Sequence, residues 1–421
     1  MKTKSKIVLD EWIGRLAVGL LNIFARLLGK IMGISHSFDK IPERIVVCKF
    51  LGMGSIIQST PLLQTLRQSF PRAKIYFVTA KANEVLLQKT LAVNEVWCVD
   101  DSNLSTILKS TLTLLRKFWS KKPDLYIDLE TYSYYSTAIA TLSLSRNRLG
   151  FYRAERNIRL GVYTHMMFFN PRAPIAESYL QMARLVGCRE IEKDLFPYRV
   201  SDEERESCLS ILEKMNSESS SRYIVINPNA SDLRVERRWP LENFASLITR
   251  LSLEFPMLNF YLIGSKNEFD WVSKLHQMIS ESERQKVFNT AGKFSLGELF
   301  ALISGASLTI TNDTGPMHIS FALKKPTVCL FGPASPSQYG QNPYAFGLYK
   351  NIYCSPCVHE FLTPPCKGDN QCMKLITVEE VETISKRLLH DEHLSPPEYP
   401  AFPQQFALSN GLMTLGLVER S

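Results

Sequence analysis

The sequence predicts an α/β protein with two domains, each built on a doubly wound parallel sheet. Short apolar segments rich in β-branched residues alternate with helical segments, a pattern typical of parallel strands joined by right-handed crossover helices. The alternation occurs in two separate runs, residues 44–150 and 223–331. Ligands of such sheets bind at the carboxyl ends of the strands. We therefore expect two Rossmann-like domains that face a cleft, one binding a donor and the other an acceptor.

The first 40 residues predict a basic amphipathic helix. Residues 11–34 are mostly apolar and lack proline, and polar side chains recur along one stripe, at Arg15, Asn22, Arg26 and Lys30. The longest charge-free run, residues 16–25, is short for a hydrocarbon core of about 30 Å. We expect the helix to lie on an anionic membrane surface, helped by the lysines at positions 2, 4 and 6. The alternatives are packing on the protein or a partner, and an uncleaved signal anchor.

The acceptor domain is expected at residues 41–175 and the donor domain at 222–393, with a helical linker at 176–221 and a proline-rich, extended or disordered tail at 394–421. The expected strands are 44–50, 71–79, 94–99, 124–129, 146–150, 223–227, 258–263, 306–310 and 327–331. A helix is expected over 56–70, and loops over 151–169. Gly52, Gly54 and Ser55 follow the first strand, but two glycines alone do not make a dinucleotide fingerprint.

The segment at residues 311–333, TNDTGPMHISFALKKPTVCLFGP, predicts a strand, a polar turn, a short helix and a second strand. Asn312, Asp313, Thr314 and Gly315 form the turn, and Pro316 suits the first turn of the helix. A helix N-terminus with free amides beside a glycine turn can bind an anion. The alternative is an ordinary capped helix.

Composition restricts the class of protein. A hydrophobic fraction of 45% and a charged fraction of 21% are those of a globular chain. The formal charge of +8 over 421 residues suits an anionic small molecule or a membrane surface, and we expect no nucleic-acid partner. The nine cysteines, without a cleavable signal pattern, indicate a reducing compartment.

Several segments, in order, resemble the family 9 glycosyltransferases, which include the ADP-heptose lipopolysaccharide heptosyltransferases. They are residues 52–79, 237–251 (RRWPLENFASLITRL), 262–271 (LIGSKNEFDW), 289–310 and 311–333. The resemblance covers roughly residues 44–385. It implies a GT-B fold and an inverting, metal-independent enzyme that transfers a sugar from a nucleotide-sugar bound in the C-terminal domain.

The resemblance also implies roles for individual residues. Asp313, Thr314 and Gly315 would meet the donor diphosphate and sugar, and His318 could reach the same oxygens. Either Arg237 or Arg238 would neutralise the leaving group, at a position where the family often has lysine. Further donor contacts would come from Asn229, Ser231 and Glu268.

One position departs from the family pattern. Heptosyltransferases usually carry Gly-Asp in the first strand–helix loop, where the aspartate would deprotonate the acceptor, but this chain has Gly54 and Ser55. Serine cannot accept that proton without a base of its own. Glu130, at the end of the fourth strand, is the replacement candidate, ahead of Asp128, which would lie deeper. The alternatives are chemistry that relies on leaving-group stabilisation, and a relative that binds without turnover.

Cys354, Cys357, Cys366 and Cys372 have the spacing of a tetrahedral thiolate site. We expect a structural zinc or iron there, since the autotransporter heptosyltransferases are similar in carrying a cysteine-held iron; free thiols and two disulfides are the alternatives. No cofactor is expected for catalysis.

The sequence thus predicts a glycosyltransferase of the bacterial cell envelope. It would move a sugar, such as heptose, from ADP-heptose or another nucleotide-sugar to a glycolipid or polysaccharide acceptor. Its location would be the cytoplasm, at the inner face of the membrane.

Overall fold

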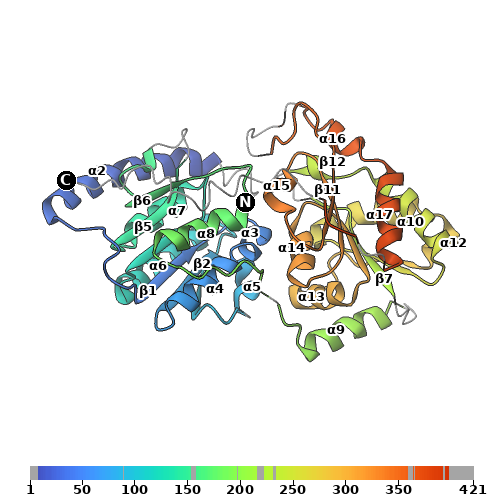
Figure 1. Ribbon diagram of the computed structural model, residues 1–421, viewed down its shortest axis with the longest axis horizontal. Coiled ribbons are helices and arrows are strands. Elements are labelled where there is room, and N and C mark those ends of the chain that lie inside the picture. The colour runs from blue at the N-terminus through green and yellow to red at the C-terminus, as the bar shows by residue number, and fades with distance from the viewer. Residues whose placement is uncertain are drawn as a thin grey trace. The chain divides into compact units, whose positions relative to one another are not determined.

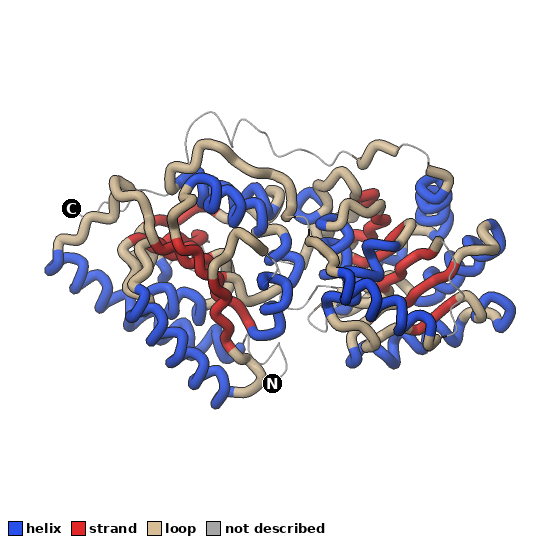
Figure 2. The backbone as a smooth tube through the Cα atoms, turned by 90° about the horizontal axis from the view of Figure 1, so that it is seen from below, coloured by secondary structure: helices blue, strands red, loops and turns tan. Residues whose placement is uncertain are grey.

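The structure is a computed structural model that describes residues 8–88, 90–152, 158–196, 198–215, 222–230, 234–358, 364, 366–391 and 394–397. Two segments with predicted roles lie outside this part of the chain. They are the N-terminal segment with lysines at positions 2, 4 and 6, and the tail from residue 398. The chain divides into two compact units, which separate between Phe196 and Pro197 (Figure 1). In each unit the strands are enclosed by helices, as Figure 2 shows.

The first unit contains a parallel sheet with strand order β3-β2-β1-β4-β5-β6. Its strands are β1 (Arg44–Cys48), β2 (Lys74–Ala80), β3 (Glu95–Val99), β4 (Leu125–Asp128), β5 (Asn147–Tyr152) and β6 (His165–Phe168). Apolar residues of the central strands are fully buried, as expected of a sheet covered on both faces. This is the doubly wound order, and the two halves of the sheet diverge between β1 and β4.

Two expectations for the first unit were wrong. Residues 151–169 were expected to be loops, but β6 pairs with β5 from Leu149 and His165 to Tyr152 and Phe168. The helix expected over 56–70 is two helices, α3 (Met53–Ile57) and α4 (Thr60–Ser69). The hydroxyls of Ser59 and Thr60 donate to the carbonyls of Ile56 and Ile57, which closes the first helix before Pro61 opens the second.

The other helices of the first unit are α5 (Glu84–Gln88), α6 (Leu104–Lys121), α7 (Tyr134–Leu142) and α8 (Ile175–Leu185). A π-helical turn, η1 (Asp10–Gly14), continues as α2 (Arg15–Met32). By length and composition, Asp10–Met32 could cross a membrane. At about 1.5 Å per residue it is longer than a bilayer core, so counting only the charge-free residues underestimated its span.

The second unit repeats the doubly wound order, as β12-β11-β10-β7-β8-β9. The strands are β7 (Tyr223–Asn227), β8 (Asn259–Leu262), β9 (Val287–Asn289), β10 (Leu308–Asn312), β11 (Thr327–Phe331) and β12 (Ala345–Tyr349). The last of these, β12, was not expected from the sequence. The two halves of the sheet diverge between β7 and β10.

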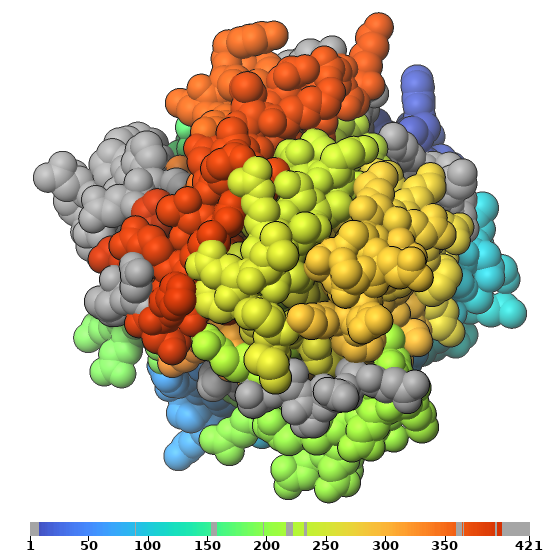
Figure 3. Space-filling model, turned by 90° about the vertical axis from the view of Figure 1, so that its right-hand side faces the viewer, coloured from blue at the N-terminus to red at the C-terminus, as the bar shows by residue number. Residues whose placement is uncertain are grey.

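The helices of the second unit are α9 (Asp202–Glu213), α10 (Leu241–Glu254), α11 (Phe269–Met278), α12 (Glu281–Arg284), α13 (Leu296–Gly305), α14 (Gly315–Ala322), α15 (Pro336–Tyr339), α16 (Gln371–Lys374) and α17 (Val378–Leu389). In Figure 3, α17 (red) lies beside α10 (yellow-green), where Arg250 pairs with Glu379 and Glu382. The expected linker at 176–221 is shared between the units, because α8 packs on α4 in the first and α9 packs on α13 in the second.

Candidate functional site

The candidate site of the second unit lies where its sheet diverges. Residues 228–229 follow β7 and residues 313–315 follow β10, so both turns lie at the carboxyl ends of adjacent parallel strands. Ligands of doubly wound sheets bind at this topological switch point. The turn predicted to bind an anion therefore lies where doubly wound sheets bind their ligands.

The N-terminus of α14 has no side-chain cap. Thr314 precedes the helix in extended conformation, but its side chain makes no capping hydrogen bond. Instead its hydroxyl accepts a hydrogen bond from the Asn227 amide at 2.6 Å. The first amides of a helix need a partner, and the positive end of the helix dipole favours an anion there. An anionic ligand is the partner that this helix start can take.

A buried ion pair adjoins this helix start. Arg237 Nη1 lies 3.3 Å from Asp313 Oδ2 and donates to the Asp313 carbonyl at 3.1 Å. Asp313 is almost fully buried, and its Oδ2 accepts no hydrogen bond from the described residues. Burial raises the pKa of Asp313, while the charge of Arg237 acts in the opposite direction. The site thus combines a cation, a carboxylate with unused acceptor capacity and a helix N-terminus.

The two adjacent arginines have different surroundings. Arg238 donates to the carbonyl of Ala230 at 3.0 Å, and its guanidinium lies 4.5 Å from the centre of the Trp271 ring. Because Arg238 stacks on Trp271 and Arg237 pairs with Asp313, only Arg237 lies at the start of α14. The sequence alone left this choice open.

The other predicted donor residues are placed as follows. His318 is buried in α14, and desolvation, aided by the charge of Arg237, lowers its pKa to about 3, so the imidazole is neutral. Glu268 closes a capping box, in which its carboxylate accepts from the backbone N–H and the hydroxyl of Ser265, both at 2.8 Å. Asn229 is buried and donates to the carbonyl of Ile263. Ser231 lies outside the described residues.

An asparagine network that the sequence did not reveal holds the two turns together. Asn227 donates to the hydroxyls of Thr311 and Thr314. Asn312 donates to the carbonyl of Asn229 at 3.0 Å and accepts from the backbone N–H of Trp239 at 3.1 Å. These bonds connect the ends of β7 and β10 to the segment that carries Arg237. A clue was present in the sequence, since Asn227 and Asn312 each end a buried strand.

The first unit has a buried ion pair at its own switch point. Lys49 Nζ lies 2.8 Å from Glu130 Oε2, and Glu130 Oε1 accepts from the backbone N–H groups of Phe50 and Leu51, both at 2.8 Å. Glu130 is therefore at the carboxyl edge of the sheet, where we expected it. With partners on both oxygens, its carboxylate has the surroundings of a group that fixes the loop after β1.

The position of the missing aspartate is also engaged. A hydrogen bond joins the side chains of Ser55 and Tyr179. Gly52 has a φ of 87°, a conformation that favours glycine and lets the chain turn into α3. Gly54, in α3, is buried. Asp128 is fully buried, with a pKa raised to about 6 by desolvation, and accepts from the Tyr163 hydroxyl at 2.5 Å. A side chain at this depth cannot meet an acceptor hydroxyl directly.

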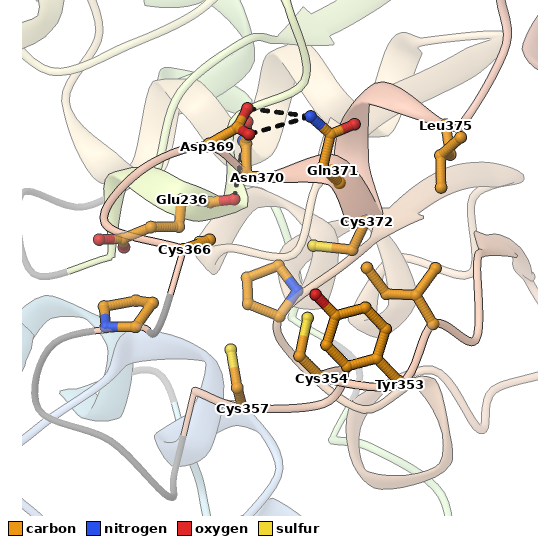
Figure 4. Close-up of a pocket in the computed structure, with 13 residues that line it drawn as sticks. Glu236, Tyr353, Cys354, Cys357, Cys366, Asp369, Asn370, Gln371, Cys372 and Leu375 are labelled. Carbon is orange, nitrogen blue, oxygen red and sulfur yellow. Dashed lines mark hydrogen bonds between the residues drawn. The ribbon is translucent and has the colours of Figure 1, made fainter.

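The four predicted metal ligands line a cavity of about 420 Å³ in the second unit. Figure 4 shows Cys354, Cys357, Cys366 and Cys372 around it. Burial and the neighbouring sulfurs raise the pKa of Cys372 to about 12, so this side chain is a thiol in the metal-free protein. Across the described ranges, no three His, Cys, Asp or Glu side chains group closely enough to hold a metal ion. The described residues therefore do not support the expected zinc or iron site.

The cysteine-rich segment instead supports the loop that carries Arg237. The side-chain amide of Asn370 donates to the carbonyls of Glu236 and Arg238, at 3.0 and 2.8 Å, on either side of Arg237. Arg234 donates to the carbonyl of Val358 at 3.0 Å. The segment is distant from residues 311–333 in sequence but is bonded to the same site.

Comparison with known proteins identifies a family. The sequence profile of glycosyltransferase family 9 (heptosyltransferase) matches residues 111–364. The chain is 24% identical to lipopolysaccharide heptosyltransferase 1 of Campylobacter coli over 363 residues, which are 83% of this chain and all of that protein. The glycosyl transferase family 9 protein of Veillonella parvula has a similar fold, with a TM-score of 0.70 and 21% identity over 85% of this chain and all of that one.

A second solved structure, the ADP-heptose heptosyltransferase II of Escherichia coli, matches with a TM-score of 0.66 and 21% identity, over 83% of this chain and 99% of that one. Together with the paired doubly wound sheets, these similarities show the GT-B fold and a glycosyltransferase. Because the family profile spans more than half of the sequence, the chain belongs to glycosyltransferase family 9.

Proposed function

We propose that this protein is an inverting heptosyltransferase that uses a nucleotide-sugar, with ADP-heptose as the first candidate, and acts on a glycolipid of the lipopolysaccharide core. One observation carries the proposal: the uncapped N-terminus of α14, with the Arg237–Asp313 pair beside it, lies at the switch point of the second unit. The names of the relatives support the donor and the acceptor, since they are lipopolysaccharide and ADP-heptose heptosyltransferases.

The donor diphosphate would bind at the start of α14. The helix amides and the Arg237 guanidinium are donors without negative charge, which suits phosphate oxygens. Asp313 Oδ2, which accepts no hydrogen bond from the described residues, would accept one from a hydroxyl of the sugar. His318 would be a neutral donor or acceptor behind them. Asn229, Ser231 and Glu268 remain proposed contacts for the rest of the donor.

In the reaction, the acceptor oxygen forms a bond to the anomeric carbon while the bond from that carbon to the phosphate oxygen breaks. The electron pair of the broken bond goes to the departing diphosphate, and the proton of the acceptor hydroxyl passes to solvent water. Attack opposite to the leaving group inverts the anomeric configuration. Arg237 and the α14 dipole stabilise the charge that grows on the diphosphate, so we propose that no metal ion is required.

For the acceptor side, we propose that Glu130 positions the loop at Gly52–Ser55 rather than serving as the base. The Lys49 pair and the two loop amides on its carboxylate support this choice. The chemistry would then depend mainly on leaving-group stabilisation. We propose that the protein acts in the cytoplasm, at the inner face of the membrane that would hold a lipid-linked acceptor.

The test is transfer by the purified full-length protein, with ADP-, GDP- and UDP-sugars offered in turn and core glycolipid as acceptor. We expect nucleoside diphosphate release that depends on the acceptor, is greatest with ADP-heptose and persists after treatment with a chelator. Donor binding without turnover by any donor would contradict the proposal and indicate a binding protein. Loss of turnover on chelation, restored by a divalent cation, would contradict metal independence.

A further inference from the structure

The N-terminal helix combines a face fixed to the first unit with an opposite face that is apolar and exposed. From this combination we infer that η1 and α2 dock in the plane of an anionic lipid bilayer as a rigid part of the first unit. They would neither cross the membrane nor act as a flexible tether. The inference concerns how the protein meets lipid, and its first test does not depend on the proposed transfer reaction.

The fixed face is formed by residues spaced four apart, which we call the contact stripe: Asp10, Gly14, Val18, Asn22 and Arg26. The carboxylate of Asp10 accepts hydrogen bonds from the first backbone N–H groups of α7, at Tyr134 (2.9 Å) and Tyr135 (2.6 Å). Gly14 allows close approach, since a Cβ there would lie 2.7 Å from the Cβ of Tyr134. Val18 is fully buried in the core of the unit.

The other half of the contact stripe holds the loop before β6. The Asn22 amide donates to the carbonyls of Ile158 and Leu160, both at 2.6 Å. Arg26 donates to the carbonyl of Leu160 at 3.0 Å and to the side-chain oxygen of Asn22. Gly161, with a φ of 100°, leaves space for these two side chains. The stripe therefore follows the first unit for about 24 Å, at about 1.5 Å per residue.

The segment after the helix is fixed as well. Arg146 Nε donates to the carbonyl of Ser35 at 2.8 Å, and the His36 ring is hydrogen-bonded to the carbonyl of Arg146. Phe38 packs on the ring of His165. Because both the helix and this segment are held to the first unit by hydrogen bonds and packing, α2 is not a flexible tether. Figure 1 shows α2 lying along the first unit beside α7, with which it is in contact.

These contacts oppose a membrane-spanning role, although the length of the helix would permit one. A crossing orientation would carry α7, the loop at residues 158–161 and the polar groups bound to them into the hydrocarbon. Lying in the interface requires only that the opposite face be apolar. That face carries large exposed side chains: Trp12, Ile13, Leu16, Leu20, Ile23, Phe24, Leu27, Leu28, Ile31 and Met32.

Charge identifies anionic lipid as the occupant of this face. Arg15, Arg26 and Lys30 are exposed basic residues of α2, and α2 itself contains no acidic residue. Over η1 and α2 together these three basic residues outnumber the two acidic ones, Asp10 and Glu11, so the segment is net positive, and Asp10 is bonded to α7. An apolar face flanked by basic residues is the pattern of helices that lie at the headgroup level of anionic bilayers.

The position of the helix in the unit adds a consequence that rests on the proposed function. Asp10 caps α7, and Arg159 donates to the carbonyls of Glu130 and Ser133 in the turn that joins β4 to α7. The helix is therefore coupled to the carboxyl edge of the sheet, which would receive the acceptor. A bilayer-embedded glycolipid would meet that edge without leaving the membrane.

The test is co-sedimentation of the full-length protein with vesicles of phosphatidylethanolamine and phosphatidylglycerol. The double variant Leu20→Glu/Phe24→Glu should lower the vesicle partition coefficient at least about tenfold, since it removes two large apolar side chains from the lipid-facing surface. The matched control is Leu253→Glu/Met257→Glu, which changes two apolar residues of the second unit with 71% and 83% exposure and should bind like the parent. Equal binding by both variants would overturn the inference.

Depth separates docking in the plane from crossing. We would compare quenching of Trp12, and of a Phe24→Trp variant in a Trp12→Phe background, by lipids brominated near the headgroup or deep in the acyl chain. In-plane docking predicts the same shallow depth at both positions, because both lie on the exposed face. Deep quenching at position 24 alone would show a crossing helix. The parent protein could instead self-associate without lipid, and the Leu20→Glu/Phe24→Glu change could abolish that association. This result would assign the apolar face to a second copy of the chain.

Transfer assays then test the coupling to the acceptor edge. The double variant should keep the parent's transfer rate on a soluble, delipidated core oligosaccharide. Its transfer rate on glycolipid embedded in vesicles should fall at least about tenfold. Equal loss on both acceptors would overturn the coupling. Absence of transfer by the parent protein on either acceptor would count against the proposed function, and the vesicle-binding result would stand.

Discussion

Replacing Arg237 should lower the transfer rate far more than replacing its neighbour Arg238. In the structure, Arg237 Nη1 lies 3.3 Å from the nearest carboxylate oxygen of Asp313. A diphosphate oxygen at a similar distance would be attracted by about 5 kcal/mol at an effective dielectric constant of about 20. If about half a unit of charge develops on that oxygen in the transition state, Arg237 contributes about 2.5 kcal/mol to catalysis. Arg237→Gln should then lower kcat by on the order of 10².

The assay is steady-state release of nucleoside diphosphate, with kcat and KM measured separately. Arg237→Lys keeps the charge but loses the forked geometry, so it should retain more activity than Arg237→Gln. Arg238→Gln is the matched control: it should lose the stacking on Trp271, at a cost of about 1 kcal/mol in unfolding free energy, and keep kcat within a few-fold. A larger loss of kcat in Arg238→Gln than in Arg237→Gln would refute the assignment of the two arginines.

Three further predictions concern buried titratable groups. The folded-state pKa of Asp128, about 6, exceeds its ordinary value of 3.8. The stability that the protonated Asp128 contributes should therefore be complete below pH 3.8. It should decline by about 3 kcal/mol as the pH rises through 6. Denaturant unfolding of Asp128→Asn should lack that decline, and an unchanged pH dependence would contradict it. Glu130→Gln should destabilise the protein by on the order of 3 kcal/mol, by leaving Lys49 buried without its partner, and slow transfer less than about tenfold. A loss beyond a hundredfold with an altered pH profile would make Glu130 the base after all. The pKa of His318 is lowered to about 3. His318→Gln should therefore leave the shape of the kcat–pH profile between about pH 5 and 8 unchanged. Loss of an inflection in that range would show that His318 titrates during turnover.

The sequence predicted the two doubly wound sheets because their central strands are continuous apolar runs, which stand out against the helical segments. The edge strands β6 and β12 were missed. Their sequences, HMMF and AFGLY, contain residues of low strand propensity or no clear alternation, and their pairing with β5 and β11 depends on tertiary contacts.

The same distinction applies to the site. Asp313, Thr314 and Gly315 could be predicted because the turn and helix that present them are contiguous in the chain. The pairing of Lys49 with Glu130, and the bonds from Asn227 to Thr311 and Thr314, depend on which strands are neighbours and in which register. Arg237 and Arg238 differ in their partners, Asp313 and Trp271, and local sequence does not encode which partner each of two adjacent arginines meets.

The bare start of α14 has a consequence for anyone who would stabilise this protein. Judged by stability alone, the helix start is a defect, because Thr314 faces Asn227 instead of capping the helix. Substitutions that restored a cap could raise the melting temperature of the ligand-free protein, since a good cap adds about 1 kcal/mol. The restored cap would occupy the amides that a diphosphate needs. Selection for thermal stability alone should therefore yield variants with a higher melting temperature and weaker donor binding. The increase in melting temperature on adding donor should be smaller in those variants.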